Sequence, residues 1–189
     1  MQRTVTYFEK PGPENTTKCL DIVREALRDF NYRHIVVAST TGSTGELIAE
    51  TLKGSGVNLV VITHSYGFKE PNSLEMPDAI KEKIQASGAR VYTGTMITHS
   101  LETALSGKFG GLYPTLLVAQ TLRRFGEGPK VCCEIVMMAS DAGLIPEGEE
   151  VIAVAGTGRG ADTVMVIRSA VSKRFLDLKV LEILAKPRG

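Results

Sequence analysis

The sequence predicts an α/β fold in which helices cover both faces of a mostly parallel sheet that also contains an antiparallel strand. Short apolar, β-branched runs recur along the chain, segments with apolar residues at helical spacing separate them, and a glycine-rich turn follows two of the runs. Runs that do not alternate between apolar and polar residues are typical of strands covered on both faces. With 189 residues, the chain is expected to form one domain over 1–189.

The first half of the chain alternates helices and strands. The loop 10–17 is expected to deliver a capping residue to a helix in which apolar residues recur at helical spacing from Cys19 to Phe30. Further strands are predicted at 34–38, 58–63 and 89–93, and further helices at 46–52 and from Pro77, a residue suited to a first helical turn.

The second half is helical before it returns to strands. Apolar residues recur at helical spacing over about 98–142, and glycine-containing segments at 107–111 and 126–129 are predicted to interrupt the helices. Two strands are predicted next, at 149–155 and 162–168. Because only a tight turn joins them, these two strands must be antiparallel. A last strand, at the edge of the sheet, is predicted from the alternating apolar residues Leu176, Leu178 and Val180.

Composition and charge exclude several classes of protein. The chain has 22 Lys and Arg against 21 Asp and Glu, and a formal charge of +1 argues against a nucleic-acid-binding surface or a polybasic membrane anchor. No run approaches the roughly 20 apolar residues of a membrane span, and the first residues lack the apolar core of a secretory signal. The three cysteines do not suggest a disulfide framework. We therefore expect a cytoplasmic protein that binds neither nucleic acid nor membranes.

The turn 39–45 is the first candidate ligand site. It joins a predicted strand to a predicted helix, and its candidate residues are Thr40, Thr41, Gly42, Ser43, Thr44 and Gly45. Amide groups at the start of a helix attract anions, and each charge-assisted hydrogen bond contributes about 1.5–3 kcal/mol. The hydroxyl groups could instead cap the helix, but a cap needs only one. We therefore predict that the turn binds phosphate; a nucleoside-triphosphate loop would need a Lys where Glu46 stands.

The turn 156–160 is the second candidate ligand site. It consists of Gly156, Thr157, Gly158, Arg159 and Gly160. Because it leads into a strand rather than a helix, it does not fit the dinucleotide-binding fingerprint. A plain hairpin turn would account for its glycines. Arg159 adds a guanidinium that can pair with a phosphate held by the neighbouring turn, unless Asp162 neutralises it.

The histidines and cysteines are weaker candidates for ligand-binding, metal-binding or catalytic residues. His64 follows the strand 58–63 and either hydrogen-bonds a ligand or is an ordinary loop residue, whereas capping or exposure is the simpler interpretation of His99. No two of the three histidines have the spacing of helical metal ligands, so no metal site is predicted. Cys132 and Cys133 lie in an apolar run and are interpreted as buried.

Four segments carry a resemblance to a known family. They are the residues 34–45, 59–63, 145–158 and 163–167. Their order resembles that of the C-terminal α/β domain of pyruvate kinase, and in particular that of archaeal-type stand-alone proteins similar to this domain. The resemblance extends over about 16–167, and it depends on the order of the segments because each of them alone is weakly specific.

The resemblance implies a phosphate ligand rather than the kinase reaction, whose chemistry resides in a separate barrel domain. In the family, the turn matched by 41–45 holds a phosphate of an allosteric sugar bisphosphate, and the loop matched by 156–160 closes on the same ligand. The stand-alone relatives look like binders of flavin mononucleotide (FMN), which makes FMN the leading ligand, with its phosphate on Ser43 and Thr44. The loop 64–71 has no simple counterpart in the kinase domain, so the ligand need not be a sugar.

Three functions are open at this point. The first is binding of FMN with a redox role, the second is a non-catalytic module that senses a sugar phosphate, and the third is an enzyme acting on phosphate esters. Whether the chain is an enzyme is therefore not decided. Each function implies a phosphorylated small molecule as partner. The apolar run 178–183 could also pair two copies of the chain as a homo-oligomer.

Overall fold

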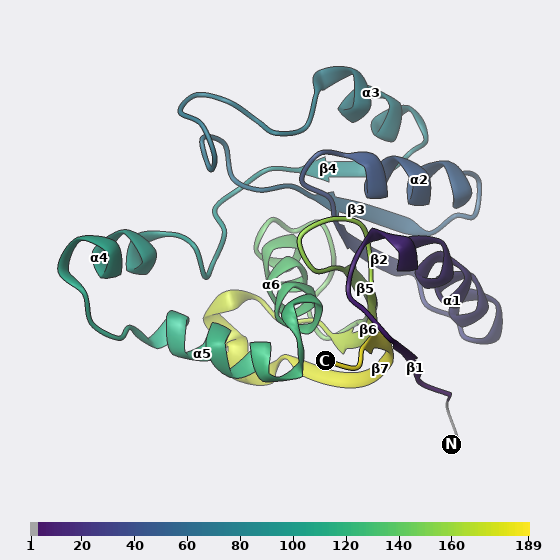
Figure 1. Cartoon of the computed structure of the whole chain (residues 1–189). Coiled ribbons are helices and arrows are strands. Elements are labelled where there is room, and N and C mark those ends of the chain that lie inside the picture. Colours follow the sequence, from purple (N-terminus) through teal and green to yellow (C-terminus); the bar gives the residue numbers. More distant parts are fainter. Residues whose placement is uncertain (1–3) are drawn as a thin grey trace.

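The computed structural model describes residues 4–189, which form a seven-stranded sheet with helices on both faces (Figure 1). The strands are β1 (Thr6–Phe8), β2 (His34–Ala38), β3 (Asn58–Ile62), β4 (Arg90–Tyr92), β5 (Glu150–Ala155), β6 (Thr163–Arg168) and β7 (Lys179–Pro187). Their order across the sheet is β1-β7-β6-β5-β2-β3-β4. In this sheet β6 runs antiparallel to β5 and β7 and the other pairs are parallel, so the predicted fold class is confirmed.

The described residues form six α-helices, four of which cover the faces of the sheet. They are α1 (Thr16–Asp29), α2 (Ser43–Thr51), α3 (Asp78–Ala86), α4 (Leu101–Phe109), α5 (Pro114–Leu122) and α6 (Glu127–Asp141), with 3₁₀ turns at Pro13–Asn15, Arg123–Phe125 and Ser172–Asp177. One core joins α1, α2 and α3 to the sheet and includes Ile35 and Val37 of β2. The other core joins α6 to the opposite face and includes Val36. Because both faces are covered, strands such as β2 do not need polar residues at alternate positions.

Helices α4 and α5 extend away from the sheet (Figure 1). Several of their large apolar side chains are exposed, among them Leu101 and Phe109, at 76% and 73%. The break between these helices lies at Gly110–Tyr113, later than the predicted 107–111, because α4 continues through Gly107 to Phe109. Within residues 4–189, none of the helices combines the length and the apolar character needed to cross a lipid bilayer.

The chain reverses its direction across the sheet between β2 and β5. From β2 it runs outward to β3 and β4, then returns along the other face through α6 and places β5 on the opposite side of β2. Strand β2 pairs in parallel with β3 and with β5, so all three carboxyl ends open at one edge. Ligands of open α/β sheets bind at such a reversal. The turns 39–45 and 156–160 both emerge at this point.

Helix α2 begins earlier than the sequence indicates. It starts at Ser43 rather than Glu46, so the second half of the predicted turn is the first turn of the helix. Gly42 precedes it with φ of 95°, and a Cβ there would lie 2.4 Å from Cγ2 of Ile80. A glycine is therefore required at this position for both its backbone conformation and its lack of a side chain.

Two other helix starts also differ from the sequence prediction. α6 begins at Glu127, inside the predicted break at 126–129, because Pro129 lies in the first turn, where an amide hydrogen bond is not needed. Pro77 does not lie in the first turn of α3; its extended φ and ψ place it just before the helix. Helix α1 begins at Thr16, within the predicted loop 10–17.

The C-terminal strand is not an edge strand, which corrects the sequence prediction. β7 extends over Lys179–Pro187, and β1 lies outside it, pairing in parallel with its last three residues. Leu176 belongs to the 3₁₀ turn that precedes the strand. The early apolar residues of the chain therefore occupy the edge that the sequence assigns to the C-terminus, and the argument for pairing two copies through an edge at 178–183 is weakened.

Close packing of α2 on β3 fixes the position of the helix start. Gly45 is buried, and a Cβ at this residue would lie 2.7 Å from Cγ1 of Val61. The Gly45 amide donates a hydrogen bond of 2.9 Å to Oγ of Ser39. At the outer side of the same turn, Glu46 pairs with Lys83 of α3 at 3.1 Å. The absence of a side chain at Gly45 thus lets the helix approach the sheet.

A buried ion pair attaches α6 to the segment that follows β4. Nζ of Lys130 lies 2.6 Å from Oε2 of Glu134, and the two side chains are 2% and 3% exposed. Oε1 of Glu134 accepts hydrogen bonds from the amide and the hydroxyl group of Thr98, both at 2.7 Å. Burial by itself would raise the pKa of Glu134, but the Lys130 ammonium and the Thr98 donors outweigh it and hold this pKa below its ordinary value of 4.5.

We predict that Gly45→Ala lowers the free energy of unfolding by about 1–3 kcal/mol, because the added methyl group overpacks the contact with Val61. The measurement is urea denaturation followed by circular dichroism. Gly107→Ala in α4 is the matched control, since a Cβ there meets nothing within 4 Å and alanine is favoured inside helices. Equal stability of Gly45→Ala and wild type would contradict the close approach of α2 to β3.

We predict that Glu134→Gln destabilises the protein by about 3–5 kcal/mol, because the Lys130 ammonium stays buried without its partner. Removing both charges, in Lys130→Met with Glu134→Gln, should restore much of this loss. As a control, Lys83→Met with Glu46→Gln removes an exposed pair and should change the stability by less than about 1 kcal/mol.

The same ion pair predicts a pH dependence. The folded-state pKa of Glu134 is lowered, so its stabilising effect is complete above the ordinary pKa of 4.5 and is lost as the pH falls through the lower folded-state value. The decline in unfolding free energy below about pH 4.5 should therefore be less steep in the double variant than in wild type. Urea denaturation at neutral and acidic pH measures this; identical slopes would show that Glu134 does not titrate as proposed.

Candidate functional site

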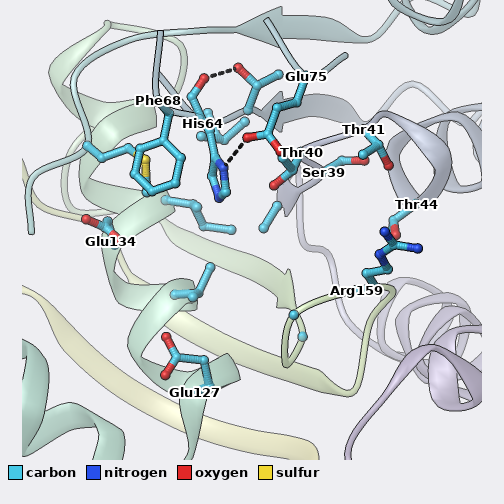
Figure 2. A pocket seen from close by; sticks show the side chains of 18 of the residues that line it. Ser39, Thr40, Thr41, Thr44, His64, Phe68, Glu75, Glu127, Glu134 and Arg159 are labelled. Atoms are coloured by element: carbon cyan, nitrogen blue, oxygen red, sulfur yellow. Dashed lines mark hydrogen bonds and ion pairs between the residues drawn. The ribbon is translucent and has the colours of Figure 1, made fainter. Parts of the chain in front are cut away.

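A cleft of about 630 Å³ opens at the carboxyl ends of β2, β3 and β5 (Figure 2). Its walls come from the two glycine-rich turns, the loop after β3, the segment after β4 and the start of α6. Its volume lies within the range of roughly 300–1,000 Å³ that is usual for small-molecule sites. The cleft therefore occupies the place that the reversal of the chain between β2 and β5 predicts.

The start of α2 forms one end of the cleft. Its lining includes Thr40, Thr41, Ser43 and Thr44. The amides of Ser43 and Thr44 are the first two of the helix, and no acceptor for them occurs among residues 4–189. Gly42, the N-cap residue, has no side chain, and among residues 4–189 only the Ser39 hydroxyl accepts a bond from this helix start, at the Gly45 amide, so capping accounts for one of the hydroxyl groups. These donors and the positive end of the helix dipole favour an anion.

Three of the sequence-predicted residues do not line the cleft. They are Gly42, Gly45 and Thr157. Gly42 and Gly45 shape the turn and bring α2 close to the sheet, and the Gly45 amide is already used by Ser39. The amide of Thr157 is likewise used, because it donates a hydrogen bond to Asp162. These residues support the site rather than contact a ligand in it.

Asp162 holds the turn 156–160 in place. This carboxylate is fully buried, and its Oδ2 accepts hydrogen bonds from the amides of Gly12 at 3.1 Å and Thr157 at 3.0 Å. The turn is also attached to α1, because the amide of Ala161 donates to Oγ1 of Thr16 at 2.9 Å. A Cβ on Gly160 would lie 2.4 Å from Cα of Pro13. The N-terminal loop and the second glycine-rich turn are thus packed against each other.

Arg159 lies exposed at the tip of this turn and lines the cleft with Gly156, Gly158 and Gly160. Asp162 accepts its hydrogen bonds from two amides and from the Thr163 hydroxyl group, so the alternative that Asp162 neutralises Arg159 is not supported. Within residues 4–189 the guanidinium makes no hydrogen bond or ion pair of its own. Figure 2 shows its side chain extending toward Thr44 at the start of α2.

His64 and Phe68 form the opposite end of the cleft (Figure 2). Nδ1 of His64 lies 2.8 Å from Oε1 of Glu75. Because a carboxylate only accepts hydrogen bonds, Nδ1 carries the proton and Nε2 is the ring atom available to a ligand. The ring of Phe68 lies 4.3 Å from that of His64 and 6.0 Å from that of His99. His64 is therefore a cleft residue, as one of the two sequence interpretations proposed.

His99 also lines the cleft, so it is not simply exposed as its simpler interpretation suggested. Its burial, and then the charge of Lys130, lower the pKa of His99. Its Nδ1 lies 3.2 Å from Oγ1 of Thr98, and the proton of that hydroxyl group goes to the Glu134 carboxylate. Nδ1 of His99 is therefore the donor to Thr98.

The floor of the cleft is apolar, and a second ion pair stands beside it. The apolar side chains are Ile62, Met96, Ile135 and Met138. Arg123 donates to the Glu127 carboxylate from Nε at 2.7 Å and from an outer nitrogen at 3.2 Å. The cleft therefore has hydrogen-bond donors for an anion at one end, an aromatic wall at the other end and an apolar floor.

Sequence reasoning did not find Glu75, Glu127 or the pair of Lys130 and Glu134. Lys130 and Glu134 have the i, i+4 spacing of helical ion pairs, and this spacing in the sequence could have indicated that they interact. Glu75 lies at the far end of a long loop, and no local pattern marks it as a partner of His64.

The cysteines are confirmed as buried residues. Burial raises the pKa of Cys19 and of Cys133 to about 12, and it raises that of Cys132 well above its ordinary value. Such thiols stay protonated at neutral pH and are poor nucleophiles. In the described part of the chain, no three side chains of the metal-binding types are grouped as a metal ion would require.

Comparisons with known proteins place this geometry in a family. The family model of the pyruvate kinase α/β domain matches residues 17–167. A crystal structure of a Cryptosporidium parvum pyruvate kinase is similar at 17% identity and a TM-score of 0.44, covering 85% of this chain and 24% of that one. The complex of the Cryptosporidium parvum enzyme with ADP gives 17% identity and a TM-score of 0.44, with 86% and 25% covered.

The chain thus spans about a quarter of the length of these pyruvate kinases. The family model covers most of the elements described above, from α1 to β6. The resemblance stated from the four sequence segments is confirmed, and this chain belongs to the family of the pyruvate kinase α/β domain.

Proposed function

We propose that the cleft binds a phosphorylated cofactor, FMN, with its phosphate at the start of α2. The observation that carries this proposal is Arg159, a guanidinium that has no carboxylate partner among residues 4–189 and extends toward Thr44 (Figure 2). The amides of Ser43 and Thr44 and the neighbouring hydroxyl groups would donate to the phosphate oxygens. Gly158, beside Arg159, lines the cleft without a side chain, so the backbone of the second turn could come close to the ligand there.

The rest of the cleft fits a flavin ring better than it fits a sugar. Its floor is formed by Ile62, Met96, Ile135 and Met138, and Phe68 adds an aromatic wall. A planar, largely apolar ring gains from these apolar and aromatic contacts, which the hydroxyl groups of a sugar would not use. In Figure 2, Thr44 and Arg159 lie on the right and Phe68 on the left, so phosphate and ring would occupy different parts of the cleft.

When bound, FMN supplies redox chemistry, and the chain's own contribution would be to orient the ring. His64 presents Nε2, because Glu75 holds Nδ1. It would therefore hold a hydrogen bond to a polar edge of the ring or to a second molecule above it. A non-catalytic sensor of a sugar phosphate is the alternative, and it would use only the end of the cleft at α2.

We predict that Arg159→Ala weakens FMN binding by about tenfold to a hundredfold, because a charge-assisted hydrogen bond to the phosphate is lost. Riboflavin, which lacks the phosphate, should bind this variant and wild type equally. Quenching of flavin fluorescence on titration measures both affinities. Arg124→Ala, outside the cleft, is the matched control and should bind FMN like wild type.

Unchanged FMN affinity in Arg159→Ala would contradict the proposed place of the phosphate. If wild type shows no response to FMN while a sugar bisphosphate raises its melting temperature, the sensor is the better assignment.

We predict that Phe68→Ala weakens the binding of FMN and of riboflavin alike, by about threefold to tenfold, because an aromatic contact with the ring is lost. Binding of inorganic phosphate, which needs only the start of α2, should not change. Phe109→Ala, an exposed residue of α4, is the matched control. A loss of FMN affinity without any loss of riboflavin affinity would show that Phe68 does not contact the ring.

A further inference from the structure

Lys130 is a charged group that the proposed phosphate site does not use. It contributes to the lining of the cleft but is 1% exposed, and among the fully buried side chains of the described residues it is one of the largest. Lysines are almost never fully buried unless they are paired. Its partner, Glu134, accounts for the charge, but the hydrogen-bonding capacity of the ammonium is greater than one carboxylate oxygen can use.

Lys130, Glu134 and Thr98 together have more hydrogen-bond donors than acceptors. An ammonium group carries three N–H donors, and within residues 4–189 Nζ of Lys130 donates once, to Oε2 of Glu134 at 2.6 Å. The other oxygen of Glu134 already accepts two hydrogen bonds from Thr98. Two N–H donors of a buried cation at the cleft wall therefore have no acceptor in the described chain. Leaving such donors unpaired is costly, so an acceptor from outside the chain, either water or a ligand group, is expected at this wall of the cleft.

We propose that Lys130 forms a second binding subsite in the cleft, which takes the carboxylate group of a small monocarboxylic acid. The ammonium would donate its two remaining hydrogen bonds to this carboxylate. Met96 and Met138, which line the same cleft, would contact the short carbon chain of the acid. Thr98 and Glu134 keep the ammonium in place before the acid arrives, so little ordering is needed on binding.

The surrounding charges favour a monoanion over a dianion. The carboxylates of Glu75, Glu127 and Glu134 line the cleft and would repel a second negative charge. The guanidinium of Arg123 is held by two hydrogen bonds to Glu127. Burial and the charge of Lys130 lower the pKa of His99, which adds no positive charge at neutral pH. Lys130 is therefore the buried cation that a carboxylate would meet in this part of the cleft.

This subsite differs from the phosphate site in its donors and in its position. The phosphate site uses backbone amides of α2 and Arg159, whereas the subsite uses a side-chain ammonium of α6 that is already held by Glu134. In Figure 2, Glu134 lies on the side of the cleft opposite Thr44 and Arg159. A phosphorylated ligand and a monocarboxylic acid could then occupy one cleft together, as a cofactor and a substrate do.

The test is a titration of the flavin-free chain of 189 residues with acetate and with lactate, observed through the methyl signals of labelled methionines. Saturable shifts are expected at Met96 and Met138, and none at Met165, which is buried away from the cleft. The double variant Lys130→Met with Glu134→Gln removes the cation without leaving a buried charge unpaired, and circular dichroism checks its fold. It should bind both acids about tenfold to a hundredfold more weakly.

Lys108→Met is the matched control, because Lys108 of α4 is exposed and lies outside the cleft lining, and its acetate affinity should equal that of wild type. Malonate, a dianion, should bind more weakly than acetate. The proposal is overturned if wild type shows no saturable shift, if the folded double variant binds acetate like wild type, or if inorganic phosphate displaces acetate competitively. Because the experiment uses no flavin, a failure of FMN binding would leave its result unaffected, and the reverse also holds.

Discussion

The parallel pairing of β2 with β5 is the contact on which the cleft depends. These strands are far apart in the sequence, and their pairing from His34↔Val151 to Val37↔Val154 brings the turns 39–45 and 156–160 to the same edge of the sheet. Without it, the amides at the start of α2 and the guanidinium of Arg159 would belong to separate surfaces. The buried apolar residues of the two strands supply the contacts that keep this pairing in register.

Buried polar groups then give the two walls of the cleft their precise form. Asp162 fixes the second glycine-rich turn through amides of Gly12 and Thr157, and Glu134 fixes the segment after β4 through Thr98. In each case a carboxylate is held by several donors, which makes its burial tolerable and leaves little freedom to the loop. The cleft is thus shaped largely before any ligand binds, and Arg159 and Lys130 keep donors to offer.

The sequence predicts those parts of the fold that repeat a simple pattern. The β-branched runs at 34–38 and 58–63 match β2 and β3 to within one residue, because burial on both faces leaves an unmistakable composition. The start of α2 could not be placed, since Ser43 and Thr44 suit a turn and a first helical turn equally well. The partnership of His64 with Glu75 depends on how a long loop returns, and local propensity does not determine that path.

The second glycine-rich turn, 156–160, is attached to the N-terminal segment, and this has a consequence for the design of a shortened protein. The family match covers 17–167, and a fragment trimmed to those limits would look like a natural unit to clone. It would nevertheless lack Gly12 and Thr16, the anchors of the second turn, as well as β1 and β7. Such a fragment would retain every residue proposed to contact the phosphate. It would lose the contacts that hold the turn carrying Arg159 in position.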